Sequence, residues 1–199
     1  YHMTDTCSNV VMGLRAGCNV GTGDWNVFIG QYAGRGCQAS SSTNTAANNI
    51  AMGCNALSEK LTTACFNIAL GAAAGLCIDT GNANVNIGYF AGCANTDANC
   101  NVAIGYAAGS MNGTGDQNIF IGTDAGKGDT TNNGSGNSGS NNVFIGCRAG
   151  YLRTTGGNNV LIGKEAGTSV NTGGNNVFIG RNAGDAVTTG TNLIAIGRD

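Results

Sequence analysis

The chain has 199 residues, a formal net charge of −2 and only 10% charged residues. Without clustered basic side chains it lacks the electrostatic footprint of a nucleic-acid-binding protein, so no nucleic-acid partner is expected. No apolar run approaches the roughly 20 residues that a membrane helix needs, so no membrane insertion is expected. We interpret residues 1–4 as a cloning remnant and residues 5–199 as a single domain.

Glycine is the most informative residue type in this chain. The sequence contains 35 glycines and no proline, whereas an average protein has about 7% glycine. Eleven glycines each follow a short apolar run: Gly13, Gly30, Gly53, Gly71, Gly88, Gly105, Gly122, Gly146, Gly163, Gly180 and Gly197. The intervals between them are 17, 23, 18, 17, 17, 17, 24, 17, 17 and 17 residues. The chain is therefore a repeat with a base period of 17 residues.

A strand is predicted in each repeat, because each has a β-branched or aliphatic run that ends at Gly. In chain order the strands are expected over residues 10–12, 27–29, 50–52, 68–70, 85–87, 102–104, 119–121, 143–145, 160–162, 177–179 and 194–196. One such strand cannot bury itself alone, whereas identical coils stacked in register can. The predicted fold is an all-β, parallel β-solenoid of eleven coils. With about 4.8 Å between coils, the rod is roughly 50 Å long.

The two longest intervals predict loop insertions near residues 35–46 and 127–140. Both stretches are rich in Ser, Thr, Asn and Gly, a composition typical of surface loops. We interpret them as tolerated insertions in preference to receptor-binding loops.

Aligning the repeats produces columns of like residues that are expected to stack along the rod. An Asn column precedes the strands and is predicted to form a hydrogen-bonded ladder. Its members are Asn9, Asn26, Asn49, Asn67, Asn84, Asn101, Asn118, Asn142, Asn159 and Asn176. An Ala column follows each strand-ending glycine by three residues, where only a methyl group is expected to fit. A Thr column, from Thr22 to Thr189, begins a predicted Thr-Gly corner.

Alternation along each strand places its first and third residues on one face and its middle residue on the other. We expect the first and third residues to fill the coil interior. The middle column is almost entirely apolar, and an exposed stripe of this kind is rare in monomers. It consists of Val11, Phe28, Ala51, Ala69, Asn86, Ala103, Phe120, Phe144, Leu161, Phe178 and Ala195.

The middle column is therefore predicted to be the interface of a homotrimer, with a homodimer as the other possibility. In such a trimer, three copies of Asn86 meet near the symmetry axis, where they are expected to hold a water or an ion.

Two repeats carry a family resemblance. The segment Asn101–Gly105, followed by Ala108, resembles the head repeats of trimeric autotransporter adhesins of the YadA-like or Hep/Hag type. The segment Asn142–Gly146, followed by Ala149, is similar to repeats of phage tail-fibre proteins. The resemblance implies a trimeric left-handed β-roll on a cell or virion surface that mediates attachment. It carries over no ligand-binding position, because no matching binding motif is present.

Nine cysteines are spread along the chain: Cys7, Cys18, Cys37, Cys54, Cys65, Cys77, Cys93, Cys100 and Cys147. They contain no Cys-x-x-Cys pair, so no zinc site is predicted. One interpretation is that they are small buried apolar residues. The other is that disulfides join stacked coils, because the coil spacing suits a disulfide. The candidate pairs are Cys77 with Cys93 and Cys18 with Cys37.

The sequence predicts a structural or adhesive fibre segment, located outside the cell or on a virion, that associates with itself and with an unidentified receptor or glycan. Neither catalysis nor a cofactor or metal is expected, because His2 is the only histidine and no column repeats an acidic residue. A filament or coat subunit that stacks end to end is the main alternative. An ice-binding solenoid is a minor one, based on the single rank of Thr hydroxyl groups.

Overall fold

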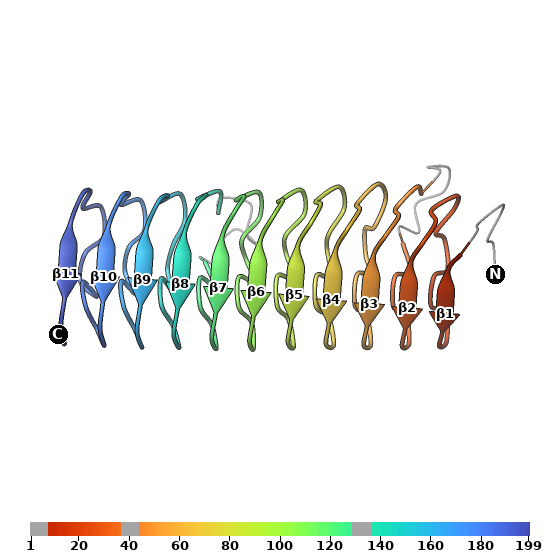
Figure 1. Cartoon of the computed structure of the whole chain (residues 1–199), viewed down its shortest axis with the longest axis horizontal. Helices are drawn as coiled ribbons and strands as arrows, with labels where there is room; N and C mark the ends of the chain where they lie inside the picture. Colours follow the sequence, from red (N-terminus) through yellow and green to blue (C-terminus); the bar gives the residue numbers. More distant parts are fainter. Residues whose placement is uncertain (1–7, 37–43, 129–136) are drawn as a thin grey trace.

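The computed structural model describes residues 8–36, 44–128 and 137–199. The described part contains eleven short strands and no helix (Figure 1). The strands are β1 (Val10–Met12), β2 (Val27–Ile29), β3 (Ile50–Met52), β4 (Ile68–Leu70), β5 (Val85–Ile87), β6 (Val102–Ile104), β7 (Ile119–Ile121), β8 (Val143–Ile145), β9 (Val160–Ile162), β10 (Val177–Ile179) and β11 (Ile194–Ile196).

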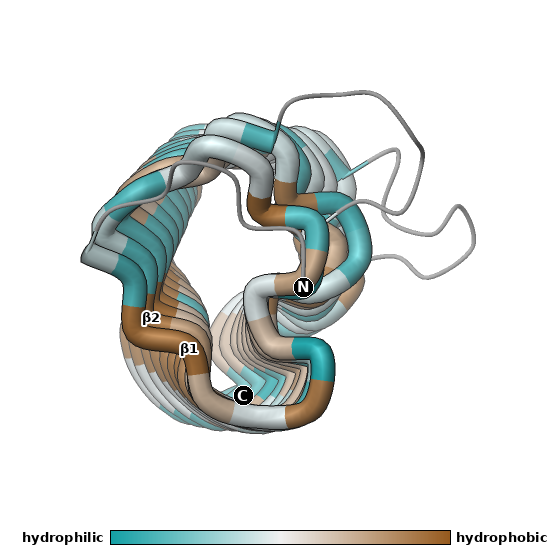
Figure 2. The backbone as a smooth tube through the Cα atoms, turned by 90° about the vertical axis from the view of Figure 1, so that its right-hand side faces the viewer, coloured by the Kyte–Doolittle hydropathy of each residue, from teal (hydrophilic) through white to brown (hydrophobic). Residues whose placement is uncertain are grey.

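All eleven strands form one parallel sheet in sequence order, β1 to β11. Each strand pairs with the next in the same register, so that Val102 of β6 lies beside Ile119 of β7. Each repeat is therefore one coil of the rod, and coil n is named here after its strand βn. The chain is a parallel β-solenoid with a base period of 17 residues, as the sequence predicted, and Figure 2 shows the coils superposed along the axis.

The strand-ending glycines allow adjacent coils to approach closely. Gly105 has a φ of +131°, and a Cβ placed on it would lie 2.7 Å from the carbonyl oxygen of Gly122 in the next coil. A second glycine column, four residues later, has φ values near +57°, as at Gly75. A Cβ on its member Gly150 would collide with the ring of Phe144. Glycine is thus required at one column by the neighbouring backbone and at the other by the core.

Two further columns adopt left-handed backbone conformations that the sequence analysis missed. One lies just before the Asn column and includes Phe66 (φ 61°), Ala83 (φ 56°) and Asn158 (φ 59°). The other lies two residues after each strand-ending glycine and includes Ala107 (φ 50°). Side chains of many kinds occupy both columns, so no residue type signals the conformation, although Asn and Asp tolerate it best.

The middle column lies inside the coil, which is opposite to the predicted orientation. Phe120, Phe144 and Leu161 have no exposed surface within a single chain, so this column cannot form the trimer interface. The first and third strand residues point outward instead. Asn86 is fully buried as well, so its predicted place on a trimer axis is wrong. The cause is space: the Ala and second glycine columns face the middle column and leave room for its Phe rings.

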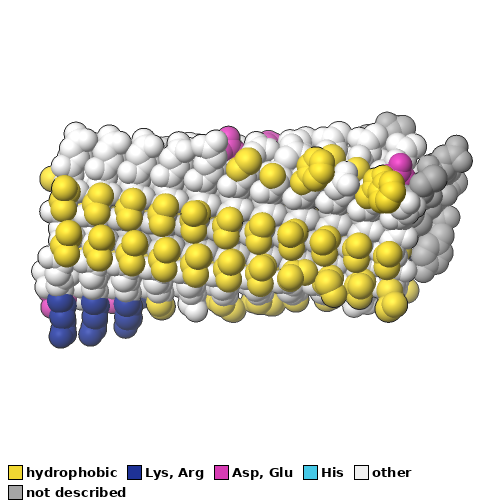
Figure 3. All heavy atoms as spheres, viewed as in Figure 1, with side chains coloured by type: hydrophobic (Ala, Val, Ile, Leu, Met, Phe, Trp, Pro, Cys, Tyr) yellow, Lys and Arg dark blue, Asp and Glu magenta, His cyan; other side chains and the backbone are white. Residues whose placement is uncertain are grey.

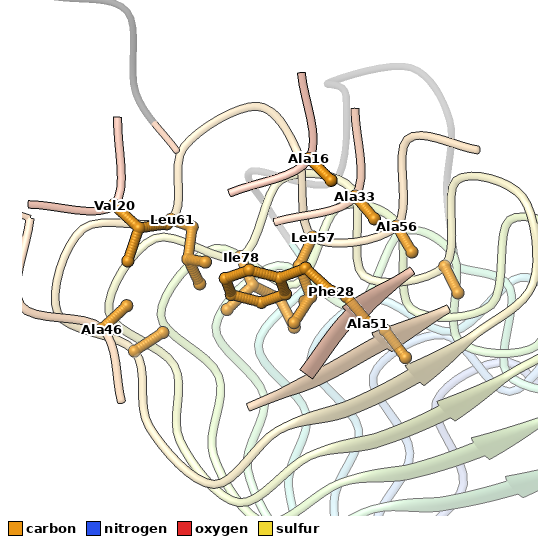
Figure 4. Packing of buried hydrophobic residues seen from close by; sticks show 13 residues of the cluster. Ala16, Val20, Phe28, Ala33, Ala46, Ala51, Ala56, Leu57, Leu61 and Ile78 are labelled. Carbon is orange, nitrogen blue, oxygen red and sulfur yellow. The ribbon is translucent and has the colours of Figure 1, made fainter. Parts of the chain in front are cut away.

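The core consists of two apolar clusters, one in coils 1 to 4 and one from Ala91 onward. In the first cluster, Phe28 packs near Leu57 and Ile78 (Figure 4). Leu57 replaces the second glycine of its coil, where the middle residue is Ala51 in place of Phe. A large side chain at one position thus compensates for a small one at the other, which keeps the interior filled. The clusters meet at coil 5, whose interior holds Asn86 and Asn95, both fully buried, beside Ala91 of the second cluster.

The Asn column forms a continuous ladder that runs along the rod beside the starts of the strands. The Oδ1 atom of Asn159 accepts hydrogen bonds from the backbone N–H and the Nδ2 of Asn176, both at 3.0 Å. Its own Nδ2 donates to Oδ1 of Asn142 at 3.1 Å and to the carbonyl of Gly173 at 2.9 Å. Both polar atoms of this buried side chain are therefore satisfied, and the amide ties three successive coils together.

Both insertions rejoin the coil through an equivalent buried asparagine. Asn137 donates through Nδ2 to the carbonyl of Met111 at 2.6 Å. Asn44, at the equivalent position of the first insertion, donates instead to the carbonyl of Leu61 in the following coil. The rest of the two predicted loops, residues 37–43 and 129–136, lies outside the described residues.

Candidate interaction face

The outward-pointing first and third strand residues form two aliphatic rows along the whole sheet (Figure 3). This surface is called the aliphatic face. It consists of Val10, Met12, Val27, Ile29, Ile50, Met52, Ile68, Leu70, Val85, Ile87, Val102, Ile104, Ile119, Ile121, Val143, Ile145, Val160, Ile162, Val177, Ile179, Ile194 and Ile196.

No part of the described chain covers the aliphatic face. In the middle of the rod Ile119 and Ile121 expose 37% and 36% of their surface, although neighbouring coils flank them on both sides. In the last coil Ile194 and Ile196 expose 75% and 73%. Single exposed aliphatic residues are ordinary, but an unbroken apolar surface over eleven strands is typical of an interaction site.

The borders of the aliphatic face change in character along the rod. In the N-terminal half, Trp25 and Phe66 are exposed, and in the middle of the rod Tyr89 stacks on Tyr106 with ring centroids 5.5 Å apart. In the last three coils, a file of cations borders the face instead (Figure 3). It consists of Lys164, Arg181 and Arg198, which each follow a strand-ending glycine. Exposed aromatic residues thus occur from Trp25 to the middle of the rod, and positive charge borders the face at the C-terminal end.

The Thr column lies away from the strands, on an exposed corner. Thr80 and Thr114 are both exposed, and Thr80 donates a hydrogen bond to Asp97 of the next coil at 2.9 Å. Because the column is a single rank outside the sheet, its hydroxyl groups do not form the flat two-dimensional array that ordering of ice would require.

Two shallow depressions lie among the turns that follow the strands. One, of about 280 Å³, is lined by Tyr89, Tyr106 and Lys127 among others. The other, of about 330 Å³, is lined by polar side chains that include Arg148 and Glu165. Those two residues form an ion pair at 3.6 Å, so the charged groups of the second depression are largely occupied with one another.

The candidate disulfide between Cys77 and Cys93 joins residues that are adjacent but present as free thiols. The backbone N–H of Cys77 donates to the carbonyl of Cys93 at 2.8 Å. Burial, followed by the charge of Glu59, raises the pKa of the Cys77 thiol to about 12 and that of Cys93 to about 11. Both thiols therefore stay protonated at neutral pH, which disfavours their oxidation.

Neither interpretation, as small buried residues or as disulfide partners, applies to all of the other cysteines. Cys18 is a free thiol, and its predicted partner Cys37 lies outside the described residues. Of the seven described cysteines only Cys93 is buried, while Cys54, Cys100 and Cys147 are exposed. Among the seven described cysteines, the interpretation as small buried residues thus applies only to Cys93.

Neither a family model nor a curated protein nor a solved structure was found to match the chain. Across the described ranges, no three potential metal ligands among His, Cys, Asp and Glu come together. No helix in the same ranges has the length and hydropathy needed to cross a membrane. The aliphatic face is therefore the most extensive candidate site that the structure offers.

Proposed function

We propose that the chain is a structural segment of a surface fibre and that it assembles with copies of itself through the aliphatic face. The observation that carries this proposal is the pair of outward aliphatic rows that run without a break from β1 to β11. A rod whose interior is already filled does not need these side chains for its own folding. Their regular β-branched and aliphatic character points to a second use, which is contact with another rod.

The magnitudes favour association. Full burial of one aliphatic side chain contributes about 1.5–3 kcal/mol relative to full exposure. Nine of the 22 side chains on the face still expose between 36% and 75% of their surface, and the other thirteen are half-buried. The loss of translational and rotational freedom on association costs about 4–15 kcal/mol. With 22 side chains on the face, the summed apolar gain is of the same order as this cost or larger.

The proposed assembly is a homotrimer in which three aliphatic faces meet around one axis. The resemblance of Asn101–Gly105 and Asn142–Gly146 to repeats of trimeric adhesins and tail fibres supports this number and an exposed location on a cell or virion surface. In this proposal the corners and depressions remain accessible, and they are the surfaces from which attachment to a receptor proceeds. No catalytic activity is proposed.

The replacement Ile104→Lys is expected to convert the trimer into monomers. Ile104 lies in the middle of the face, in register with Ile87 and Ile121. A lysine there would bring three positive charges together in an apolar interface, where neither hydration nor a partner offsets them. Light scattering should give a mass of about three chains for the unaltered protein and one chain for the variant.

Thr114→Lys is the matched control, because it adds the same charge at an exposed corner outside the face. It should leave the mass unchanged. A monomeric unaltered protein would contradict the proposal, and a trimeric Ile104→Lys variant would show that another surface mediates association. A mass that grows with concentration beyond three chains would favour the filament alternative.

A further inference from the structure

Two columns of exposed side chains border the aliphatic face. The leading border is the residue two positions before each strand, such as Phe66 before β4, and it is exposed in all eleven coils. The trailing border is the residue two positions after each strand, such as Tyr89 after β5. It is exposed in every coil except coil 4, where Ala72 is half-buried. The file of cations in Figure 3 belongs to this trailing border.

The two borders complement each other in size within single coils. Coil 4 has the ring of Phe66 on its leading border and only the methyl group of Ala72 on its trailing border. Coil 5 has the reverse, with Ala83 on the leading border and Tyr89 on the trailing one. Two more coils pair one aromatic border residue with a smaller one: Trp25 with Gln31 in coil 2, and Tyr106 with Cys100 in coil 6. No coil carries an aromatic residue on both borders.

Within one chain the two borders do not meet, because the strand and its flanking residues separate them. Across the described ranges Phe66 stacks on no other ring, whereas Tyr89 stacks on Tyr106 along the trailing border. Compensation in volume is expected between side chains that share one space. The space that the two borders would share therefore lies between two rods.

Rotational symmetry brings the two kinds of border together. When parallel rods surround one axis, the leading border of each rod lies beside the trailing border of the next, with equal coils at equal height. In an antiparallel pair, related by a twofold axis across the rods, each border would meet its own kind with the coil order reversed. The match in size within single coils thus favours parallel rods.

We propose that Phe66 of one rod packs over Ala72 of the next rod and against the ring of Tyr89. This inference rests on the proposed self-assembly and adds the side-chain contacts that join neighbouring rods beside the aliphatic face. Phe66 is 64% exposed and Tyr89 is 49% exposed, so both rings have surface left to bury. Next to the stacked pair of Tyr89 and Tyr106, Phe66 would extend an aromatic row across the boundary between two rods.

The last three coils offer polar groups in the same arrangement. Each has a cation on the trailing border and an asparagine on the leading border: Lys164 with Asn158, Arg181 with Asn175, and Arg198 with Asn192. An amide oxygen can accept a hydrogen bond from the cation, and no two like charges face each other. Polar contacts around an apolar centre are typical of protein interfaces.

The exposed thiol of Cys147 allows a direct test. Cys147 lies on the trailing border of coil 8, and Asn141 lies on the leading border of the same coil. Asn141→Cys is compatible with the fold, because Cys100 occupies the same column with a φ of 57°, close to the 60° of Asn141. With oxidised glutathione as the oxidant, two thiols of neighbouring rods should form one disulfide, while the disulfide of glutathione is reduced to two thiols. A non-reducing denaturing gel should then show three chains joined together.

Asn175→Cys is the matched control, because it places a thiol on the same border two coils further along, about 10 Å from the height of Cys147. This variant should remain a single chain on the gel, and so should the unaltered protein, which has no coil with cysteine on both borders. Equal cross-linking of both variants would mean that the rods have no fixed register, and it would overturn the proposal.

Light scattering on the same samples separates this inference from the proposed function. A protein of three chains in solution whose Asn141→Cys variant stays uncross-linked would overturn the border contact and leave the assembly through the aliphatic face standing. A protein of one chain in solution would overturn both.

Exchanging the two side chains of coil 4 tests the contact at Phe66 itself. Ala72→Phe places rings on both borders, so the dissociation constant of the assembly should rise by at least about tenfold, because overfilling a contact is unfavourable. Adding Phe66→Ala leaves one ring, now on the trailing border, and should restore the constant to within about threefold of its original value. Sedimentation at several concentrations gives both constants. A double variant that associates as weakly as Ala72→Phe alone would overturn the proposal.

Discussion

Gly105→Ala is expected to destabilise the rod by about 3 kcal/mol or more, although it adds only one methyl group. Two effects act together. The φ of +131° at Gly105 is a conformation that residues with a side chain rarely adopt, and the new Cβ would lie 2.7 Å from the carbonyl oxygen of Gly122. Neither coil can move away without breaking the strand pairing on both sides. Urea denaturation followed by circular dichroism measures the loss.

Gly197→Ala separates the two effects. Gly197 has nearly the same conformation, with a φ of +140°, but a Cβ placed on it meets nothing within 4 Å. Its replacement should cost only the backbone strain, about 1–3 kcal/mol at most, and less if the last coil frays before the rod unfolds. Equal losses for both variants would show that close approach of the coils does not require glycine at this column.

Asn159→Leu is expected to cost about 2–6 kcal/mol, because it removes a ladder rung from between two others. Leucine is similar in size but cannot form the hydrogen bonds of the amide. The backbone N–H of Asn176 would lose its acceptor and the carbonyl of Gly173 its donor. Each buried group left without a partner costs about 1–3 kcal/mol. The change in the urea midpoint at constant slope gives the value.

The chain contains its own control for this replacement. Leu193 takes the place of Asn in the last coil, where its backbone N–H donates to Oδ1 of Asn176 at 3.0 Å and its side chain is 41% exposed. Leu193→Asn should therefore change stability by less than about 0.5 kcal/mol. A loss at Asn159 as small as this would mean that the ladder contributes little and that the coils are held by the strands and the core.

Much of the fold follows from spacing alone. A fixed interval between Gly105 and Gly122 sets one coil per repeat, and identical columns in register leave parallel pairing as the only consistent arrangement. Spacing does not determine which face of the strand points inward, because alternation assigns residues to two faces without saying which is covered. In β7 both faces are apolar, Ile119 and Ile121 on one and Phe120 on the other, so hydrophobicity could not decide.

One coil, the third, carries a signal in the sequence that distinguishes the faces. Where the second glycine is replaced by Leu57, the middle residue is Ala51, and where the middle residue is Phe144, the glycine Gly150 is kept. Such compensation in volume occurs between side chains that share one interior. The left-handed columns had no comparable signal, because residues such as Phe66 and Ala83 rarely adopt a left-handed conformation. The buried Arg153 had none either, because arginine is normally expected at the surface.

The junction of the two apolar clusters at Asn86 and Asn95 predicts that the rod unfolds in two cooperative blocks. In a linear stack each coil is stabilised by its immediate neighbours, so a weak junction limits how far unfolding spreads. Coil 5 is expected to be such a junction, since the amides of both Asn86 and Asn95 in its interior have no hydrogen-bond partner. Under heat or pulling force the rod should open one block at a time, with hydrogen exchange showing two levels of protection that meet at β5. A fibre made of such segments yields by steps and retains part of each segment intact.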